Sequence, residues 1–168
     1  MKPIGLFLSS LFAAGLFPGD RACADDLDLS HFTAADIGSP AAAGTSTLTP
    51  GGVDIVAGGT DIGGTSDQCH FFYQTFTNDF DVAVRVEALG NSDVWAKAGL
   101  MARENLDATS DELSVLATPI LGGCFFETRA SAGGSSTLKG SFPVNYPDNW
   151  LVDWKRAFKS LVSSQLSG

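Results

Sequence analysis

The sequence predicts an all-β fold, a sandwich of short antiparallel strands. From Cys69 onward, short apolar runs recur at close spacing and are separated by Gly, Asn, Asp and Pro turns. Several runs alternate apolar and polar residues with the period of two that is typical of a strand with one buried face. Helical periodicity is almost absent before residue 148, which favours strands throughout the predicted core.

The first 24 residues are predicted to be a secretory signal peptide. Lys2 precedes an apolar run over residues 4–17, and Ala22-Cys23-Ala24 forms a small-residue cleavage site. The run is too short to span a bilayer as a helix; a buried N-terminal helix is the alternative interpretation. Cleavage after Ala24 predicts a secreted, periplasmic or extracellular protein, with one soluble domain over residues 25–168 and no membrane insertion.

The charge balance argues against two classes of partner. The chain carries a formal net charge of −9. Removal of residues 1–24 takes away Lys2, Asp20 and Arg21 and leaves eight basic against eighteen acidic residues. Nucleic acids and anionic membrane surfaces attract clustered Lys and Arg, so neither is expected as a partner.

The elements can be predicted in chain order. Residues 37–68, rich in Gly, Ser, Thr and Asp, indicate turns and short edge strands such as residues 53–56. The strand signals then become dense: CHFFYQTF (69–76), DVAVRVEAL (81–89), WAKAGLMARE (95–104), SVLATPIL (114–121) and CFFETRA (124–130). Gly133-Gly134 opens a polar loop.

Alternation assigns the predicted strands two faces. The inner face is expected to contain Val82, Val84, Val86, Ala98, Leu100, Ala102, Cys124 and Phe126. The outer face is expected to carry Arg85, Glu87, Trp95, Lys97, Met101, Arg103, Phe125, Glu127 and Arg129, joined by His70, Phe72 and Gln74. Cross-strand charge pairing on a solvated sheet explains part of this face. A Trp among planar guanidinium groups also suits a sugar, with its apolar ring and hydroxyl edge.

The sequence leaves open whether two cysteines form a disulfide and whether three aspartates bind Ca²⁺. Cys69 and Cys124 remain after cleavage and either form one disulfide or pack as buried free thiols. Asp61, Asp67 and Asp93 either form turns or supply oxygen ligands to Ca²⁺, although no EF-hand-like loop is present. Without CxxC or HExxH, zinc has no support, and no cofactor is expected.

Several motifs in a fixed order resemble a known family. Asp61-Ile62, GTSDQ (64–68), HFFYQ (70–74) and WAKAGLMARE are accompanied by DIGSP (36–40), Thr118-Pro119, FFETR (125–129) and Trp150-Leu151. Over roughly residues 30–156, this order resembles an uncharacterised family of concanavalin A-like β-sandwiches named after a yeast regulator of enolase. The resemblance implies an exported, lectin-like jelly roll and supplies no catalytic residues.

The chain departs from this family at two places. Gly63 stands where relatives commonly have Trp. Relatives also continue after the Trp-Leu pair with further strands, so the resemblance implies a domain that is shortened at its C-terminal end. From Leu151, apolar residues at helical spacing, with Asp148 or Asn149 as a cap, predict a short amphipathic helix. A degenerate strand is the alternative.

Three function classes follow from these features. The preferred one is a non-catalytic carbohydrate-binding module of unknown ligand. A glycoside hydrolase is the second, but Glu87 and Glu127 are each alone on their strands, and no E-x-D-x-x-E run or G-x-S-x-G elbow occurs. An adhesive module that binds protein through its sheet is the third. The chain is therefore expected not to be an enzyme, with an oligo- or polysaccharide as its partner.

Overall fold

The computed structural model describes residues 2–7, 28–77, 80–119 and 122–154. It is nearly all β, as the sequence predicts. A short 3₁₀ turn (η1, Leu29–His31) precedes strand β2. The strands are β1 (Lys2–Phe7), β2 (Thr33–Ile37), β3 (Thr45–Thr49), β4 (Gly52–Val56), β5 (Cys69–Phe76), β6 (Asp81–Val86), β7 (Ala98–Arg103), β8 (Glu112–Ala117), β9 (Cys124–Arg129), β10 (Thr137–Phe142) and β11 (Asn149–Trp154).

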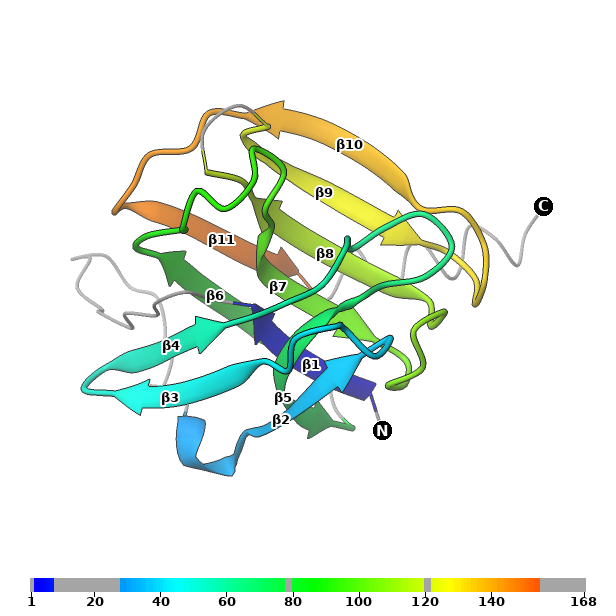
Figure 1. Cartoon of the computed structure of the whole chain (residues 1–168), viewed down its shortest axis with the longest axis horizontal. Helices are drawn as coiled ribbons and strands as arrows, with labels where there is room; N and C mark the ends of the chain where they lie inside the picture. The colour runs from blue at the N-terminus through cyan, green and yellow to red at the C-terminus, as the bar shows by residue number, and fades with distance from the viewer. Residues whose placement is uncertain (1, 8–27, 78–79, 120–121, 155–168) are drawn as a thin grey trace.

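The strands form one large sheet and two small ones. The large sheet has the order β10-β9-β8-β7-β1-β5-β2, and its neighbouring strands are antiparallel. Strand β11 pairs with β6, and β3 pairs with β4. Figure 1 shows β6, β11 and the β3–β4 hairpin arranged beside the large sheet. Together these parts make a β-sandwich-like fold.

A first apolar cluster fills the space between the large sheet and the smaller ones. Leu100 on β7 and Val115 on β8 pack there with Val84 and Val86 of β6, and the hairpin adds Val53. Strands β6 and β11 lie against β7, and β11 also lies against β8. The predicted burial of Val84, Val86, Ala98, Leu100 and Ala102 is therefore confirmed, and Val82 is half-buried at the rim.

A second cluster covers the opposite face of the same sheet. Met101, Leu116 and Phe125 pack there against Ile62, which belongs to the connection between β4 and β5. Figure 1 shows this connection crossing in front of the large sheet. Strand β7 is consequently buried at every residue from Ala98 to Arg103. The sequence predicted a solvated outer face, and this was wrong because a long connection folds back over it.

Two predicted elements change type. The polar stretch after Gly133 includes a strand, β10, whose residues are all exposed at the edge of the sheet. The expected C-terminal helix does not start at Leu151, because residues 149–154 form β11 in register with β6. The remainder of the expected helix, residues 155–168, lies outside the described residues.

The predicted signal peptide is described only in part. Residues Lys2–Phe7 form β1, a strand in the middle of the large sheet. The expected cleavage site at residues 22–24 lies outside the described residues, so processing stays a prediction. In the parts of the chain that the structure describes, no helix combines the length and the apolar composition needed to cross a membrane.

Candidate functional site

The arginines of the predicted sugar-binding face are buried instead of exposed. Arg103 at the end of β7 and Arg129 at the end of β9 both have 0 % of their surface accessible. They bind one carboxylate: Arg103 Nη1 lies 3.2 Å from Asp67 Oδ2, and Arg129 Nη1 and Nη2 lie 3.0 and 2.5 Å from Asp67 Oδ2 and Oδ1. A ligand on the surface cannot reach these guanidinium groups, so their expected role in direct binding is corrected.

Both guanidinium groups also donate to backbone carbonyls. Arg129 donates to the carbonyl oxygens of Gly63, Gly64 and Ser110. Arg103 donates to those of Asn105 and Asp107. Asp67 Oδ1 in turn accepts from the Gly63 amide at 3.0 Å. The five hydrogens of each guanidinium suit such a role, because they can bind a carboxylate and loop carbonyls together. The two arginines therefore anchor the loop over residues 61–68 onto the sheet.

The buried cluster contains a second carboxyl group. Glu112 on β8 is paired with Arg103 of β7 on one side and with Arg129 of β9 on the other. It is 1 % exposed, and in the described part of the chain neither of its carboxyl oxygens has a hydrogen-bond partner. Burial raises the pKa of Glu112 to about 8. A carboxyl group removed from water keeps its proton to a higher pH, so burial favours the neutral form of Glu112.

Lys97 ties the same loop to the sheet at its other end. Its ammonium nitrogen lies 2.7 Å from Asp61 Oδ1, 2.6 Å from the Ile62 carbonyl oxygen and 3.4 Å from Glu127 Oε2. An ammonium group has three donors, and these three acceptors use all of them. Glu127 is itself buried and also accepts from the Ser136 hydroxyl at 2.7 Å. Lys97 was expected on an accessible outer face, but it holds the loop and its charge is paired within the protein.

The other predicted binding residues lie elsewhere. His70 and Gln74 are on the face of the first cluster, since they share that side of β5 with Phe72. His70 is buried and hydrogen-bonds Asp36 Oδ1 at 2.7 Å and the Ser46 hydroxyl at 3.0 Å. The hydrogen bond from His70 holds the pKa of Asp36 below its usual range. His70 thus joins β5 to β2 and β3, and neither His70 nor Gln74 belongs to the predicted face.

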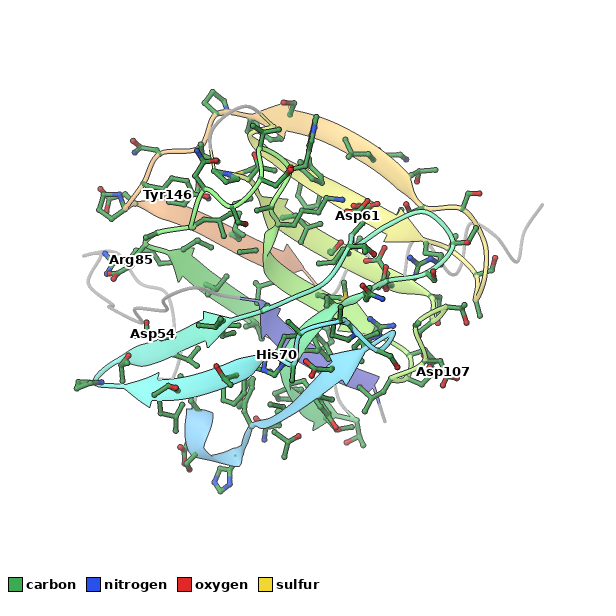
Figure 2. All side chains as sticks on the ribbon, viewed as in Figure 1. Asp54, Asp61, His70, Arg85, Asp107 and Tyr146 are labelled. Atoms are coloured by element: carbon green, nitrogen blue, oxygen red, sulfur yellow. The ribbon has the colours of Figure 1, made fainter. Side chains whose placement is uncertain are left out.

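Arg85 and Glu87 also leave the predicted face. Arg85 lies in β6 and Glu87 directly follows that strand, which pairs with β11 outside the large sheet, and their side chains form an ion pair with each other. Figure 2 shows Arg85 well separated from Asp61. Phe126 is a further correction: it was expected in the core, but 43 % of it is exposed, near the β9–β10 edge.

The structure leaves the two cysteines as free thiols, Cys69 in the second cluster and Cys124 in the first. Their strands β5 and β9 are separated by β1, β7 and β8. At about 4.8 Å per strand the two backbones lie roughly 19 Å apart. A disulfide needs Cα atoms within about 7 Å, so the bridge alternative is wrong in this fold. Burial raises the pKa of Cys69 to about 12, which keeps its thiol protonated.

Trp95 is the predicted site residue that remains accessible. It precedes β7, and 59 % of its surface is exposed. Asp93 fixes this turn, because its carboxylate accepts from the Trp95 amide at 2.8 Å and its carbonyl from the Ala96 amide at 3.1 Å. A Cβ at Gly122 would come within 2.9 Å of the Trp95 ring, so one edge of the indole packs closely on that glycine. The ring is therefore held in place while much of it faces solvent.

An open groove lies beside Trp95. It has a volume of about 680 Å³ and runs between the segment 55–62 and the segment 89–98. Asp61, Asp93, Lys97 and Gln68 supply its polar atoms, and Ile55, Val56, Ile62 and Leu89 supply apolar surface. Figure 2 shows Asp61 on the connection that crosses the large sheet. The volume lies within the range of pockets that hold small organic ligands.

The groove was missed as a unit by the sequence analysis. Asp61 and Asp93 were interpreted there as turn formers or Ca²⁺ ligands, and Asp93 does form a turn. Within the described residues, no group of three or more His, Cys, Asp and Glu side chains is arranged to hold a metal ion. The signal that could have identified the groove is the pairing of Asp61 with Lys97, which joins two motifs 36 residues apart.

Comparison with known proteins adds no relative. The chain matches no family model, no curated protein and no solved structure.

Proposed function

We propose that this chain is an exported, non-catalytic carbohydrate-binding module of the concanavalin A-like jelly-roll type, with its ligand in the groove beside Trp95. The observation that carries the proposal is a fixed, exposed indole at the rim of a groove that also contains hydroxyl, amide and carboxylate groups. Aromatic faces stack on the CH surface of a pyranose ring, and carboxylate and amide oxygens accept from its hydroxyls.

The charge of the groove narrows the class of sugar. Its charged lining residues are Asp61, Asp93 and Lys97, one cation against two anions, and the cation is already bound to Asp61. Arg103 and Arg129 are buried, and the described residues that line the groove include no arginine to pair with a uronate. The proposed ligand is therefore a neutral oligosaccharide.

Binding is proposed rather than hydrolysis. Hydrolysis requires two carboxyl groups that face the scissile bond, one as acid and one as base or nucleophile. Glu127 is buried and engaged by Lys97 and Ser136, and Asp61 is held by Lys97. Both groups are thus occupied in stabilising the loop.

The experiment compares two aromatic substitutions for binding to an array of neutral and acidic oligosaccharides. Trp95→Ala should weaken binding at least several-fold, because one good contact contributes about 1–3 kcal/mol, and the melting temperature should hardly change. Phe126→Ala is the matched control, since Phe126 is also an exposed aromatic residue but lies outside the groove. Wild-type affinity should lie in the micromolar to millimolar range.

Two results would overturn the proposal. One is an array on which the wild-type protein binds no sugar. The other is equal loss of binding in the Trp95 and Phe126 variants, which would place the ligand away from the groove.

A further inference from the structure

Strand β1 joins the two halves of the large sheet. Residues Lys2 to Leu6 pair with Phe76 to Phe72 of β5, and Ile4 to Phe7 pair with Ala102 to Gly99 of β7. Because β1 is antiparallel to both neighbours, β5 and β7 run parallel to each other on its two sides. Their backbones are two strand spacings apart, about 9–10 Å. No other described strand lies between them.

On one face, three of the four residues that wall this space are apolar and buried, and the fourth is the half-buried Gln74. Residue 6 of β1 is paired with Phe72 of β5 and Leu100 of β7. Residue 4 is paired with Gln74 of β5 and Ala102 of β7. Phe72, Leu100 and Ala102 are buried, and Phe72 and Leu100 belong to the first cluster. Directly paired positions of antiparallel strands share a face. A strand seated here therefore meets the core at two alternate positions and backbone hydrogen-bonding groups along both edges.

The segment that fills the space is also part of the predicted signal peptide. If cleavage follows Ala24, Lys2–Phe7 is no longer covalently part of the domain. Strands β5 and β7 would then each present an unpaired edge next to the buried residues Leu100 and Phe72. Buried backbone groups need hydrogen-bond partners, and an open sheet edge pairs readily with another extended segment.

We propose that the space between β5 and β7 is a strand-binding slot. In the uncut chain its own Lys2–Phe7 fills it. After cleavage the slot takes an extended peptide that runs antiparallel to both strands, with apolar residues at two alternate positions. Main-chain pairing on both sides provides affinity, and the apolar wall provides the sequence preference.

The experiment uses the full chain with a site-specific protease sequence inserted between Ala24 and Asp25. The purified protein is cut, the N-terminal fragment is removed in urea, and the remainder is refolded. A fluorescent synthetic peptide of residues 1–8 is then titrated while its anisotropy is measured. Two variant peptides are compared with it on the same refolded protein: Leu6→Asp, opposite Phe72 and Leu100, and Lys2→Gln, opposite Phe76 at the strand end.

The wild-type peptide should bind saturably, the Leu6→Asp peptide at least tenfold more weakly, and the Lys2→Gln peptide within about twofold of wild type. If the cut protein refolds only when a peptide is present, tryptophan fluorescence will show this. The refolded yield must then be high with the wild-type and Lys2→Gln peptides and low with the Leu6→Asp peptide. If it associates into dimers through the slot, excess wild-type peptide must dissociate them. A folded cut protein that binds no peptide, dimers insensitive to peptide, or equal action of all three peptides would overturn the proposal.

Discussion

A single aspartate explains why the arginines of WAKAGLMARE and FFETR are buried. Asp67 belongs to the GTSDQ motif, is 1 % exposed, and binds both Arg103 and Arg129. Three of the motifs that carry the family resemblance therefore meet in one buried network. Such ion pairs contribute less to stability than their distances suggest, because each charge gives up its hydration on burial. Removing one partner is far more costly, because it leaves the others unpaired.

Substitution of Asp67 should test this asymmetry. In Asp67→Asn the two buried guanidinium groups lose their counter-charge, so the free energy of unfolding should fall by about 3–5 kcal/mol. Urea unfolding followed by tryptophan fluorescence measures the change. Asp107→Asn is the control, since that residue is exposed and should change stability by less than about 0.5 kcal/mol. A loss of less than about 1 kcal/mol in Asp67→Asn would show that the network contributes little.

Glu112 makes the stability depend on pH in a defined direction. Its pKa rises from 4.5 to about 8 on folding because of burial. Between these values the unfolded chain loses the proton and the folded chain keeps it, so stability falls as the pH rises. The slope is at most about 1.4 kcal/mol per pH unit, and it vanishes below pH 4.5 and above about pH 8.

The variant Glu112→Gln should remove this contribution. The difference in unfolding free energy between variant and wild type should therefore grow in favour of the variant from pH 5 to pH 8. Urea titrations at three pH values measure it, and taking the difference cancels other groups such as Asp36. A difference that stays constant with pH, or that changes in the opposite direction, would mean that Glu112 is ionised in the folded protein at neutral pH.

At the scale of elements, the loop over residues 61–68 decides which strand faces are accessible. Lys97 holds its first part and Arg129 its second part. Gly63 lies between these anchors with φ +134°, and a Cβ there would come within 2.3 Å of Glu127 Oε1. The Trp that relatives of the resembled family commonly carry at this position does not fit the loop as it is placed here.

Two adjacent glycines allow a matched test of the loop. Gly63→Ala should destabilise the protein by about 1–3 kcal/mol, because it combines an unfavourable backbone angle with a steric conflict. Gly64→Asn should cost less than about 1 kcal/mol, since φ is +56°, a region that Asn tolerates, and a Cβ there has nothing within 4 Å. Thermal unfolding of both variants measures the difference. Equal losses would show that the loop is not tightly seated on Glu127.

Sequence periodicity predicted the strands well and their surroundings poorly. The strand over Ala98–Arg103 and the inward direction of Leu100 and Ala102 follow from alternation alone, because a period of two fixes which residues share a face. Alternation cannot tell whether the opposite face meets water or a long connection. Arg103 therefore looked like a surface residue, and its partner Asp67 looked like a turn former. The partnership depends on contacts between residues 36 positions apart, which no local pattern contains.

At the scale of the whole molecule, the sandwich leaves Trp95 exposed while it hides the arginines. The sequence predicted a sugar-binding face made of Trp95 and basic residues, and the structure affects these two parts differently. The indole of Trp95 remains accessible, whereas the arginines of the predicted face are buried and bind Asp67. The sequence analysis placed Trp95 within a strand, whereas it lies in the turn that precedes β7. The groove beside it could not be predicted, because two connections that are distant in sequence form its walls.

The electrostatics of the whole chain lead to the last prediction. The protein carries a formal charge of −9, and the charged lining of the groove contains two aspartates and one lysine. A neutral oligosaccharide gains nothing from this field, and a uronic acid is repelled by it. Calorimetric titration should give a dissociation constant for the neutral sugar that changes less than about twofold between 0.05 and 0.5 M NaCl. A uronic-acid counterpart should bind a few-fold more weakly at low salt, and screening should narrow the gap as salt rises. Tighter binding of the acidic sugar at low salt would instead require an accessible cation at the site, and Lys97 would then have to leave Asp61 to provide it.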